Sequence, residues 1–267
     1  MTQPQYVLAF DTANETISIG VGLLDADGRA VRLVASAEAA ARRASNTQLL
    51  PRIDALLAEA GVPRGGIACV CVGRGPGSFT GVRIAMATAK GVASALEVGL
   101  VGVSTLDAVA WGCWAHGVRG RVLAVADAMR REVYPVEFSL SETGVERLGN
   151  DRVVKAAEAA EEFVLGDLSA EGPDGAFSRS SGPGSRESAT GAFGSCGTRF
   201  VNTPSGPSAA DEDFAANSSA ASSRGEGGCS RVVSGRGVVG DALRKYADLF
   251  APCGAFLPEE LWTPTGE

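Results

Sequence analysis

A short apolar run followed by a glycine-rich turn and an alanine-rich segment constrains most strongly what this chain can fold into. Residues 67–72, IACVCV, are all apolar, which is typical of a strand in the middle of a parallel sheet. The turn GRGPGSFTG, 73–81, leads into a segment rich in small residues that keeps helical spacing to Leu96. The sequence therefore predicts a strand, a tight turn and a helix within an α/β fold.

Strand and helix patterns continue on both sides of this unit. Residues 5–24 contain two β-rich runs joined by a short turn, as in a hairpin. Apolar residues in 45–60 recur at helical spacing, and Gly61 and Pro63 end that pattern. In chain order, the predicted elements of this part are the hairpin at 5–24, a strand at 29–38, a helix at 45–60, a strand at 67–72, a helix at 80–96, a strand at 100–104 and a helix at 106–115.

The second part of the chain opens like the first, with a strand pattern that ends in an aspartate. Asp11 closes the first predicted strand, and Asp127 stands near the end of the strand pattern at 121–128. This repeated opening indicates two lobes built on one plan. We place the N-terminal lobe at 1–110 and the C-terminal lobe at 111–267.

A stretch of different composition interrupts the C-terminal lobe. After a predicted hairpin strand at 131–140, residues 169–235 are dominated by Ser, Gly, Ala and Pro. Such a stretch cannot bury enough apolar area to offset its ordering entropy, so we expect it to be disordered. A strand and turn at 237–241 and a short helix at 242–250 are predicted to follow.

The composition argues against several classes of protein. A net charge of −7 provides no basic face for coating nucleic acid and no attraction to anionic lipid. No run of about eighteen apolar residues is present, so no membrane span is predicted. The N-terminal sequence has no basic segment before its strand pattern, so we predict no signal peptide and expect a cytoplasmic protein.

The six cysteines form no CxxC pair and have no metal-ligand spacing. Reduced thiols in a cytosolic protein fit this arrangement better than a disulfide framework. Cys69 and Cys71 alternate within one predicted strand, so both side chains leave the same face of the sheet and act as small apolar residues.

The glycine-rich turn fits neither of the two common phosphate-binding patterns. A P-loop needs Lys and Ser or Thr after its last glycine, but Gly81 is followed by Val82 and Arg83. The glycines at 73, 75 and 77 do not have the GxGxxG spacing of a dinucleotide-binding turn. Backbone amides at the start of the following helix, capped by Ser78 or Thr80, could still attract an anion. The alternative is a tight turn that only connects a strand to a helix.

The helix after the turn carries small side chains on nearly every face. Gly91 costs helix stability, about 1 kcal/mol relative to alanine, which suggests that its missing side chain is needed for a close contact. The contact could be with another subunit or within the lobe, and the sequence does not distinguish them.

Catalytic signatures are weak. His116 is the single histidine and lies at a predicted helix end, where a surface or capping role is expected, and neither GxSxG nor HExxH occurs. Asp11 and Asp127 could hold Mg²⁺ through water and so position a phosphate, although an acid at a strand end is more often a turn residue.

Six stretches together resemble the TsaB (YeaZ) family. They are VLAFDTANETISIGV, SNTQLLPRIDALLAEAG, VGRGPGSFTGVRIAMATAKGVASAL, VGVSTLDAVA, ADAMRREVY and VVGDALRKY, at 7–21, 45–61, 72–96, 101–110, 126–134 and 238–246. The resemblance implies an actin/Hsp70-like (ASKHA) α/β fold of two lobes, each a mixed twisted sheet with helices. It also implies a role in forming N6-threonylcarbamoyladenosine in tRNA.

In that family the chain is a non-catalytic subunit that pairs with TsaD, the metal-holding transferase, while the ATPase TsaE joins them. The resemblance thus implies a TsaD-like partner, a TsaE-like ATPase, a homodimer when the chain is alone, and only indirect contact with tRNA. It implies no catalytic residue, metal or cofactor of its own, with ATP or ADP at a site shared with the partners. The implied partner surface comes from the helices at 46–60 and 80–96, with contacts at Leu49, Leu50, Ile53, Arg83, Met86, Ala89, Lys90 and Ala93. Residues near a nucleotide or phosphate would be Asp11, Thr12, Gly75, Gly77, Ser78, Thr80 and Asp127.

The chain departs from the family pattern in four places, one of which is the Ser/Gly-rich stretch at 169–235. Ser45 and Asn46 stand where the family has His-Ser, and residues 127–130, DAMR, keep the acid but only one arginine of the family's DARR. The closing helix and strand are not recognisable after Thr265, which implies a shortened form. The alternative function is an ATP-binding, kinase-like enzyme of the same fold that uses the two strand-end aspartates, or an M22-type glycoprotease.

Overall fold

The computed structural model describes residues 3–28, 30–40, 45–168 and 231–266. Most of the Ser/Gly-rich stretch predicted to be disordered therefore lies outside the described residues. Its last residues do not, because β10 begins at Arg231 and pairs with β6 there. The strand that follows the Ser/Gly-rich stretch therefore begins at Arg231, before the end predicted for that stretch at residue 235. Among the described residues, no helix is both long and apolar enough to cross a membrane.

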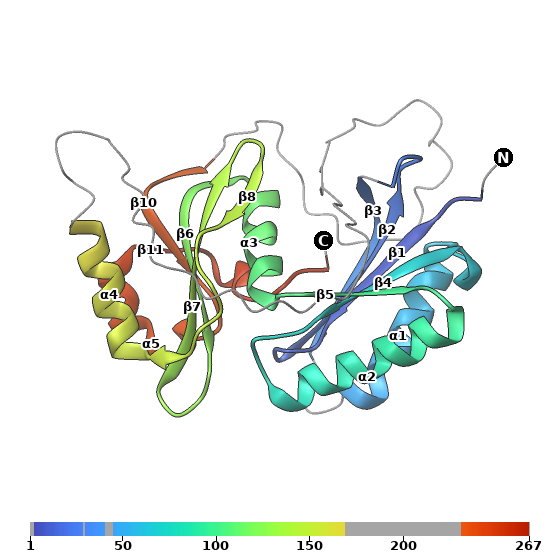
Figure 1. The fold of residues 1–267 in the computed structure, drawn as a ribbon, viewed down its shortest axis with the longest axis horizontal. Helices are drawn as coiled ribbons and strands as arrows, with labels where there is room; N and C mark the ends of the chain where they lie inside the picture. Colours follow the sequence, from blue (N-terminus) through green and yellow to red (C-terminus); the bar gives the residue numbers. More distant parts are fainter. Residues whose placement is uncertain (1–2, 29, 41–44, 169–230, 267) are drawn as a thin grey trace, which may run out of the picture.

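Five strands form the first sheet, in the order β3-β2-β1-β4-β5 (Figure 1). The predicted hairpin is confirmed, since β1 pairs with β2 in antiparallel fashion and β3 continues the meander. The predicted apolar strand is β4, which lies between β1 and β5 and is parallel to both. The strand bounds are β1 (Tyr6–Asp11), β2 (Thr16–Leu24), β3 (Val31–Ala40), β4 (Ile67–Gly73) and β5 (Gly99–Val103).

Two helices, α1 (Ser45–Glu59) and α2 (Phe79–Leu96), cover one face of this sheet (Figure 1). The buried residues of α2 recur every four positions, so they form one stripe along the helix. Each of them is glycine or alanine, which lets the helix approach the sheet closely. The stripe consists of Gly81, Ala85, Ala89 and Ala93.

The second sheet has six strands in the order β11-β10-β6-β7-β8, with β9 paired to β7 off this path. Its strands are β6 (Val118–Asp127), β7 (Glu132–Ser141), β8 (Gly144–Arg147), β9 (Val154–Lys155), β10 (Arg231–Val239) and β11 (Ala255–Phe256). Helix α3 (Thr105–Ala115) packs on one face of this sheet. Helices α4 (Ala156–Leu168) and α5 (Leu243–Phe250) pack on the other (Figure 1).

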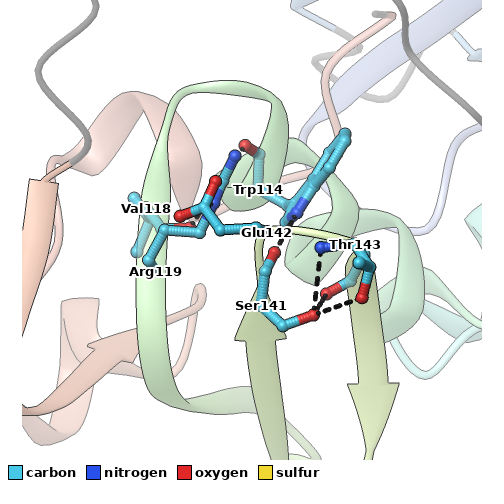
Figure 2. A network of polar contacts seen from close by, with 7 residues as sticks. Trp114, Val118, Arg119, Ser141, Glu142 and Thr143 are labelled. Atoms are coloured by element: carbon cyan, nitrogen blue, oxygen red, sulfur yellow. Dashed lines mark hydrogen bonds and ion pairs between the residues drawn. The ribbon is translucent and has the colours of Figure 1, made fainter.

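The end of α3 is fastened to the second sheet by the polar network in Figure 2. The Trp114 indole N–H donates to the Ser141 carbonyl over 2.7 Å. The Arg119 guanidinium donates to the Trp114 carbonyl over 2.8 Å and lies 4.9 Å from the centre of the Trp114 ring. Helix α3 directly follows β5 of the first sheet, but its apolar side packs against the second sheet. The boundary predicted between the lobes, at residue 110, therefore falls inside this helix.

The last described residues return from the second lobe to the first. The Ser18 hydroxyl donates to the Pro264 carbonyl over 2.6 Å, and the Gly266 amide donates to the Glu38 carboxylate over 3.1 Å. A methyl group at Gly20 would lie 2.5 Å from the Gly266 carbonyl oxygen, so these two glycines pass each other closely. The tail therefore covers β2 and β3 on the sheet face opposite α1 and α2.

Two mixed sheets with helices on their faces, joined through α3, make the two-lobed actin/Hsp70-like fold that the resemblance implied, and that expectation is confirmed. Both lobes begin with a strand that ends in an aspartate and pairs with its successor in antiparallel fashion. The repeated plan seen in the sequence thus corresponds to repeated topology.

Candidate functional site

The glycine-rich turn packs against the turn between β1 and β2. Ser78 is the N-cap of α2, and its hydroxyl accepts a hydrogen bond from the Gly81 amide over 3.3 Å. The Ser78 amide donates to the Ala13 carbonyl over 2.6 Å. The Thr12 hydroxyl donates to the Gly81 carbonyl over 2.7 Å. These bonds join the start of α2 to the β1–β2 turn.

Three glycines permit this close approach. A β-carbon at Gly73 would overlap the Asp11 carboxylate, and one at Gly81 would overlap the Thr12 carbonyl oxygen. A β-carbon at Gly77 would lie 2.5 Å from the Ala13 carbonyl oxygen, and the φ of 156° at Gly77 also favours glycine. Three of the four glycines of this turn are thus explained by close contact with the end of β1 and the β1–β2 turn.

Removal of the Ser78 hydroxyl should weaken the start of α2. Ser78→Ala is expected to lower the free energy of unfolding by about 1 kcal/mol, because the Gly81 amide loses its cap. Urea denaturation followed by circular dichroism measures this difference. Ser78→Asp, which keeps an acceptor at the cap, is the matched control and should stay near the wild-type value; equal losses in both variants would contradict the capping role.

Asp11 is buried and bonded within the chain. Its carboxylate accepts hydrogen bonds from the Thr105 hydroxyl over 2.6 Å and from the Ala13 amide over 2.5 Å. Burial raises the pKa of Asp11, and these two hydrogen bonds oppose the shift. Because Thr105 is the first residue of α3, Asp11 connects β1 of the first lobe to the helix that enters the second.

Asp127 occupies the equivalent strand end of the second lobe. Lys245 of α5 donates to its carboxylate, and the Met129 amide donates to it over 3.1 Å. The Asp127 amide in turn donates to Asp241 over 2.9 Å. No described contact joins Asp127 to Asp11.

The structure thus places the residues predicted near a nucleotide around two separate strand ends. Asp11 and Thr12 are already engaged, and the Gly75 carbonyl accepts a hydrogen bond from the Thr105 amide over 2.8 Å. Thr80 is exposed in the first turn of α2. Within the described ranges, no group of three or more His, Cys, Asp or Glu side chains has the arrangement of a metal site. Nucleotide binding at these residues stays a prediction.

Four of the predicted partner contacts are corrected by their burial. Leu49 and Ile53 of α1, and Ala89 and Ala93 of α2, all lie in the hydrophobic core of the first lobe. They face the sheet because buried positions on both helices recur every three or four residues. These side chains stabilise the lobe and are not available to another chain.

The outward side of α1 and α2 carries the remaining predicted contacts and one aromatic residue that the sequence reasoning missed. Leu50 is 49% exposed and Phe79 is 69% exposed, and the Arg83 guanidinium lies 4.0 Å from the centre of the Phe79 ring. Met86 is half-buried and Lys90 is exposed on the same helix. The sequence could have indicated that Phe79 is exposed, because this residue lies in the first turn of α2 and outside the buried stripe that begins at Gly81.

Gly91 lies on this outward side, and nothing within the described chain requires it to be a glycine. It is exposed, and a β-carbon added there would meet no atom within 4 Å. Glycine inside a helix costs about 1 kcal/mol relative to alanine. A glycine that lowers helix stability and makes no contact inside the lobe is expected where another helix packs closely against this position. Leu50, Phe79, Arg83, Met86, Lys90 and Gly91 are called the α1–α2 surface below.

His116 has a structural position. It is the C-cap residue of α3, and its Nδ1 lies 2.9 Å from the Gly112 carbonyl oxygen. The capping role expected from the sequence is confirmed.

Comparisons with known proteins agree on one family. The family model "TsaD: tRNA N6-adenosine threonylcarbamoyltransferase" matches residues 38–221. A tRNA threonylcarbamoyladenosine biosynthesis protein TsaB from Escherichia coli is 38% identical over 52% of this chain and 57% of its own length. The TsaB protein of Haemophilus influenzae is 33% identical over 48% of this chain and 51% of its own. The chain therefore spans about half the length of the curated relatives it matches.

A solved structure extends the comparison. YeaZ from Pseudomonas aeruginosa is 34% identical, with a TM-score of 0.50, over 57% of this chain and 68% of that protein. A second structure from the same organism, described as similar to peptidase YEAZ, gives a TM-score of 0.51 over the same shares of both chains.

Proposed function

The chain belongs to the TsaB (YeaZ) family, and from this we propose that it is a non-catalytic subunit that pairs with a TsaD-like transferase and activates it. The modification is the threonylcarbamoyladenosine of tRNA that the names of its relatives state. The observation that carries the pairing is Gly91, which sits exposed in α2 with open space around it.

The chemistry of the α1–α2 surface supports this role. Phe79, an exposed aromatic side chain stacked on Arg83, and Leu50, an exposed leucine on the other helix, have the composition of interface anchors. The open position at Gly91 would allow the backbone of a partner helix to come close. Lys90, the preceding residue, would lie at the polar rim of that interface.

The contacts between the lobes support a subunit that acts without opening and closing around a substrate. Arg244 of α5 lies 3.4 Å from Glu15 of the β1–β2 turn, and Arg74 lies 3.6 Å from Asp151. The Asp11–Thr105 hydrogen bond and the C-terminal tail add buried connections between the lobes. Enzymes that close their domains around a nucleotide need contacts between the domains that can break and re-form.

The remaining parts of the proposal follow from the family. A TsaE-like ATPase joins the pair, and ATP or ADP binds at a site shared between subunits. The chain alone forms a homodimer through the α1–α2 surface, touches tRNA only through its partner, and works in the cytoplasm. It contributes no catalytic residue, metal ion or cofactor of its own.

Light scattering of the purified chain, alone and mixed with the TsaD-like subunit of the same organism, tests the proposal. We expect the homodimer to disappear as a heterodimer forms, because both associations use one surface. The proposal is wrong if the two proteins elute independently at micromolar concentration. Metal-dependent ATP hydrolysis by the chain alone would instead favour the kinase-like alternative.

A further inference from the structure

Helix α2 carries two charged residues, Arg83 and Lys90, and both are cations. They are seven residues apart, which is about two helical turns, so their side chains leave the same side of the helix. Both residues are exposed. The helix contains no Asp or Glu, so an ion pair at a spacing of three or four residues within α2 is not available to either cation.

The rest of the described chain does not neutralise these cations. No ion pair between described residues includes Arg83 or Lys90. The Arg83 guanidinium stacks on the Phe79 ring instead, with 4.0 Å between the guanidinium carbon and the ring centre. A stacked guanidinium keeps its N–H donors at its edge, so Arg83 is held in place and can still bind a carboxylate.

Nothing in the helix or in the overall composition accounts for these charges. The whole chain has a net charge of −7, so α2 differs in sign from the protein that surrounds it. The first turn of α2 has no acidic residue, and the positive end of the helix dipole disfavours a cation near that turn. Arg83 is therefore in a position where the helix itself would prefer an anion.

Self-association through the α1–α2 surface would bring like charges together. In a two-fold dimer each copy presents the same side chains to the other, so the two cations of one copy share the interface with those of its partner. Helix α1 offers little to balance them, because Asp54 already pairs with Arg64 over 2.9 Å and Glu59 is the last residue of the helix. Like charges across an interface weaken such a pairing.

We propose that Arg83 and Lys90 select a partner whose contacting helix is acidic, with two carboxylates about 10 Å apart along its axis. A carboxylate beside each cation would form a charge-assisted hydrogen bond. The open position at Gly91, next to Lys90, lets the partner helix come close enough for these contacts. The inference rests on the proposed pairing and adds a reason for the exchange of homodimer for heterodimer: like charges are replaced by opposite ones.

Calorimetric titration of the full chain with the TsaD-like subunit of the same organism is the first test. We expect the double variant Arg83→Glu/Lys90→Glu to bind about 100-fold more weakly than the wild type. We also expect the wild-type affinity to fall as added salt screens the opposite charges. Arg32→Glu/Arg130→Glu is the matched control, because it changes the net charge equally at exposed positions outside the α1–α2 surface and should bind like the wild type.

A mixture of wild-type chain and the Arg83→Glu/Lys90→Glu variant tests the same charges without the partner. One of the two proteins is labelled with ¹⁵N, and native mass spectrometry counts each kind of dimer. We expect the mixed dimer to exceed the share that random exchange gives, because opposite charges then meet across the interface.

Two results would overturn the inference and leave the pairing intact. One is equal affinity of the reversed and control variants for the TsaD-like subunit. The other is a mixed dimer no more abundant than random exchange predicts. Absence of any complex between the wild-type chain and the TsaD-like subunit would instead contradict the proposed function, and this inference with it. Circular dichroism of each variant confirms that the fold is retained.

Discussion

Gly81→Ala is expected to lower the free energy of unfolding by about 3 kcal/mol or more. The added methyl group would overlap the Thr12 carbonyl oxygen, which is a backbone atom held in place by the β1–β2 turn. Either the first turn of α2 or that turn must move, and both the Thr12–Gly81 and Ser78–Ala13 hydrogen bonds depend on their present positions. Overpacking of this kind ranks among the costlier single substitutions.

Gly91→Ala in the same helix provides the matched control. A β-carbon there meets no atom within 4 Å, so alanine should raise the free energy of unfolding by about 0.5–1 kcal/mol through helix propensity alone. Urea denaturation of the two variants beside the wild type gives both differences, at a concentration where the chain is monomeric. If the two substitutions shift stability in the same direction, the assigned role of Gly81 in packing is incorrect.

The sequence predicted the strands and helices of the first lobe because their apolar patterns are strong and their ends carry Gly or Pro. The same reasoning did not identify α4 in the second lobe. Its buried side chains are the alanines Ala156, Ala159 and Ala160, which give little contrast in hydrophobicity along the helix. β9 has two residues and exists only through its pairing with β7, so no local pattern could show it.

The glycine-rich turn shows why the site was harder to predict than the fold. The sequence left phosphate binding and a tight connection as alternatives, because both need glycine before a helix. The deciding contacts come from Thr12 and Ala13, which are far away in the chain and reach the turn only when β1 lies beside β4.

The orientation of α2 was hidden for a related reason. Alanines occupy both its buried and its exposed sides, so composition cannot tell Ala89, which faces the sheet, from Ala87, which faces outward. The close approach of Gly81 to the Thr12 carbonyl shows which side of the helix faces inward at its start. From that anchor the spacing of four residues places Ala85, Ala89 and Ala93 inward and leaves Gly91 outside.

Gly91→Arg is expected to separate folding from association. Arginine is a better helix former than glycine and here projects into open space, so the lobe should be at least as stable as the wild type. A partner helix that approaches the backbone at this point would meet a long charged side chain. We expect the affinity for the TsaD-like subunit, and self-association, to fall by about 100-fold, measured by light scattering and calorimetry.

The control for charge is Ala157→Arg, at an exposed position on α4 of the second lobe, which should leave association unchanged. Arginine at Ala89 or Ala93 cannot serve this purpose, because both side chains are buried and the variants would lose stability before they lost a partner. Retained affinity in a folded Gly91→Arg variant would show that partner binding does not use the outward side of α2. Partner binding would then not explain why a glycine that lowers helix stability occupies position 91. Lost affinity together with raised stability would show that the missing side chain serves the partner rather than the lobe.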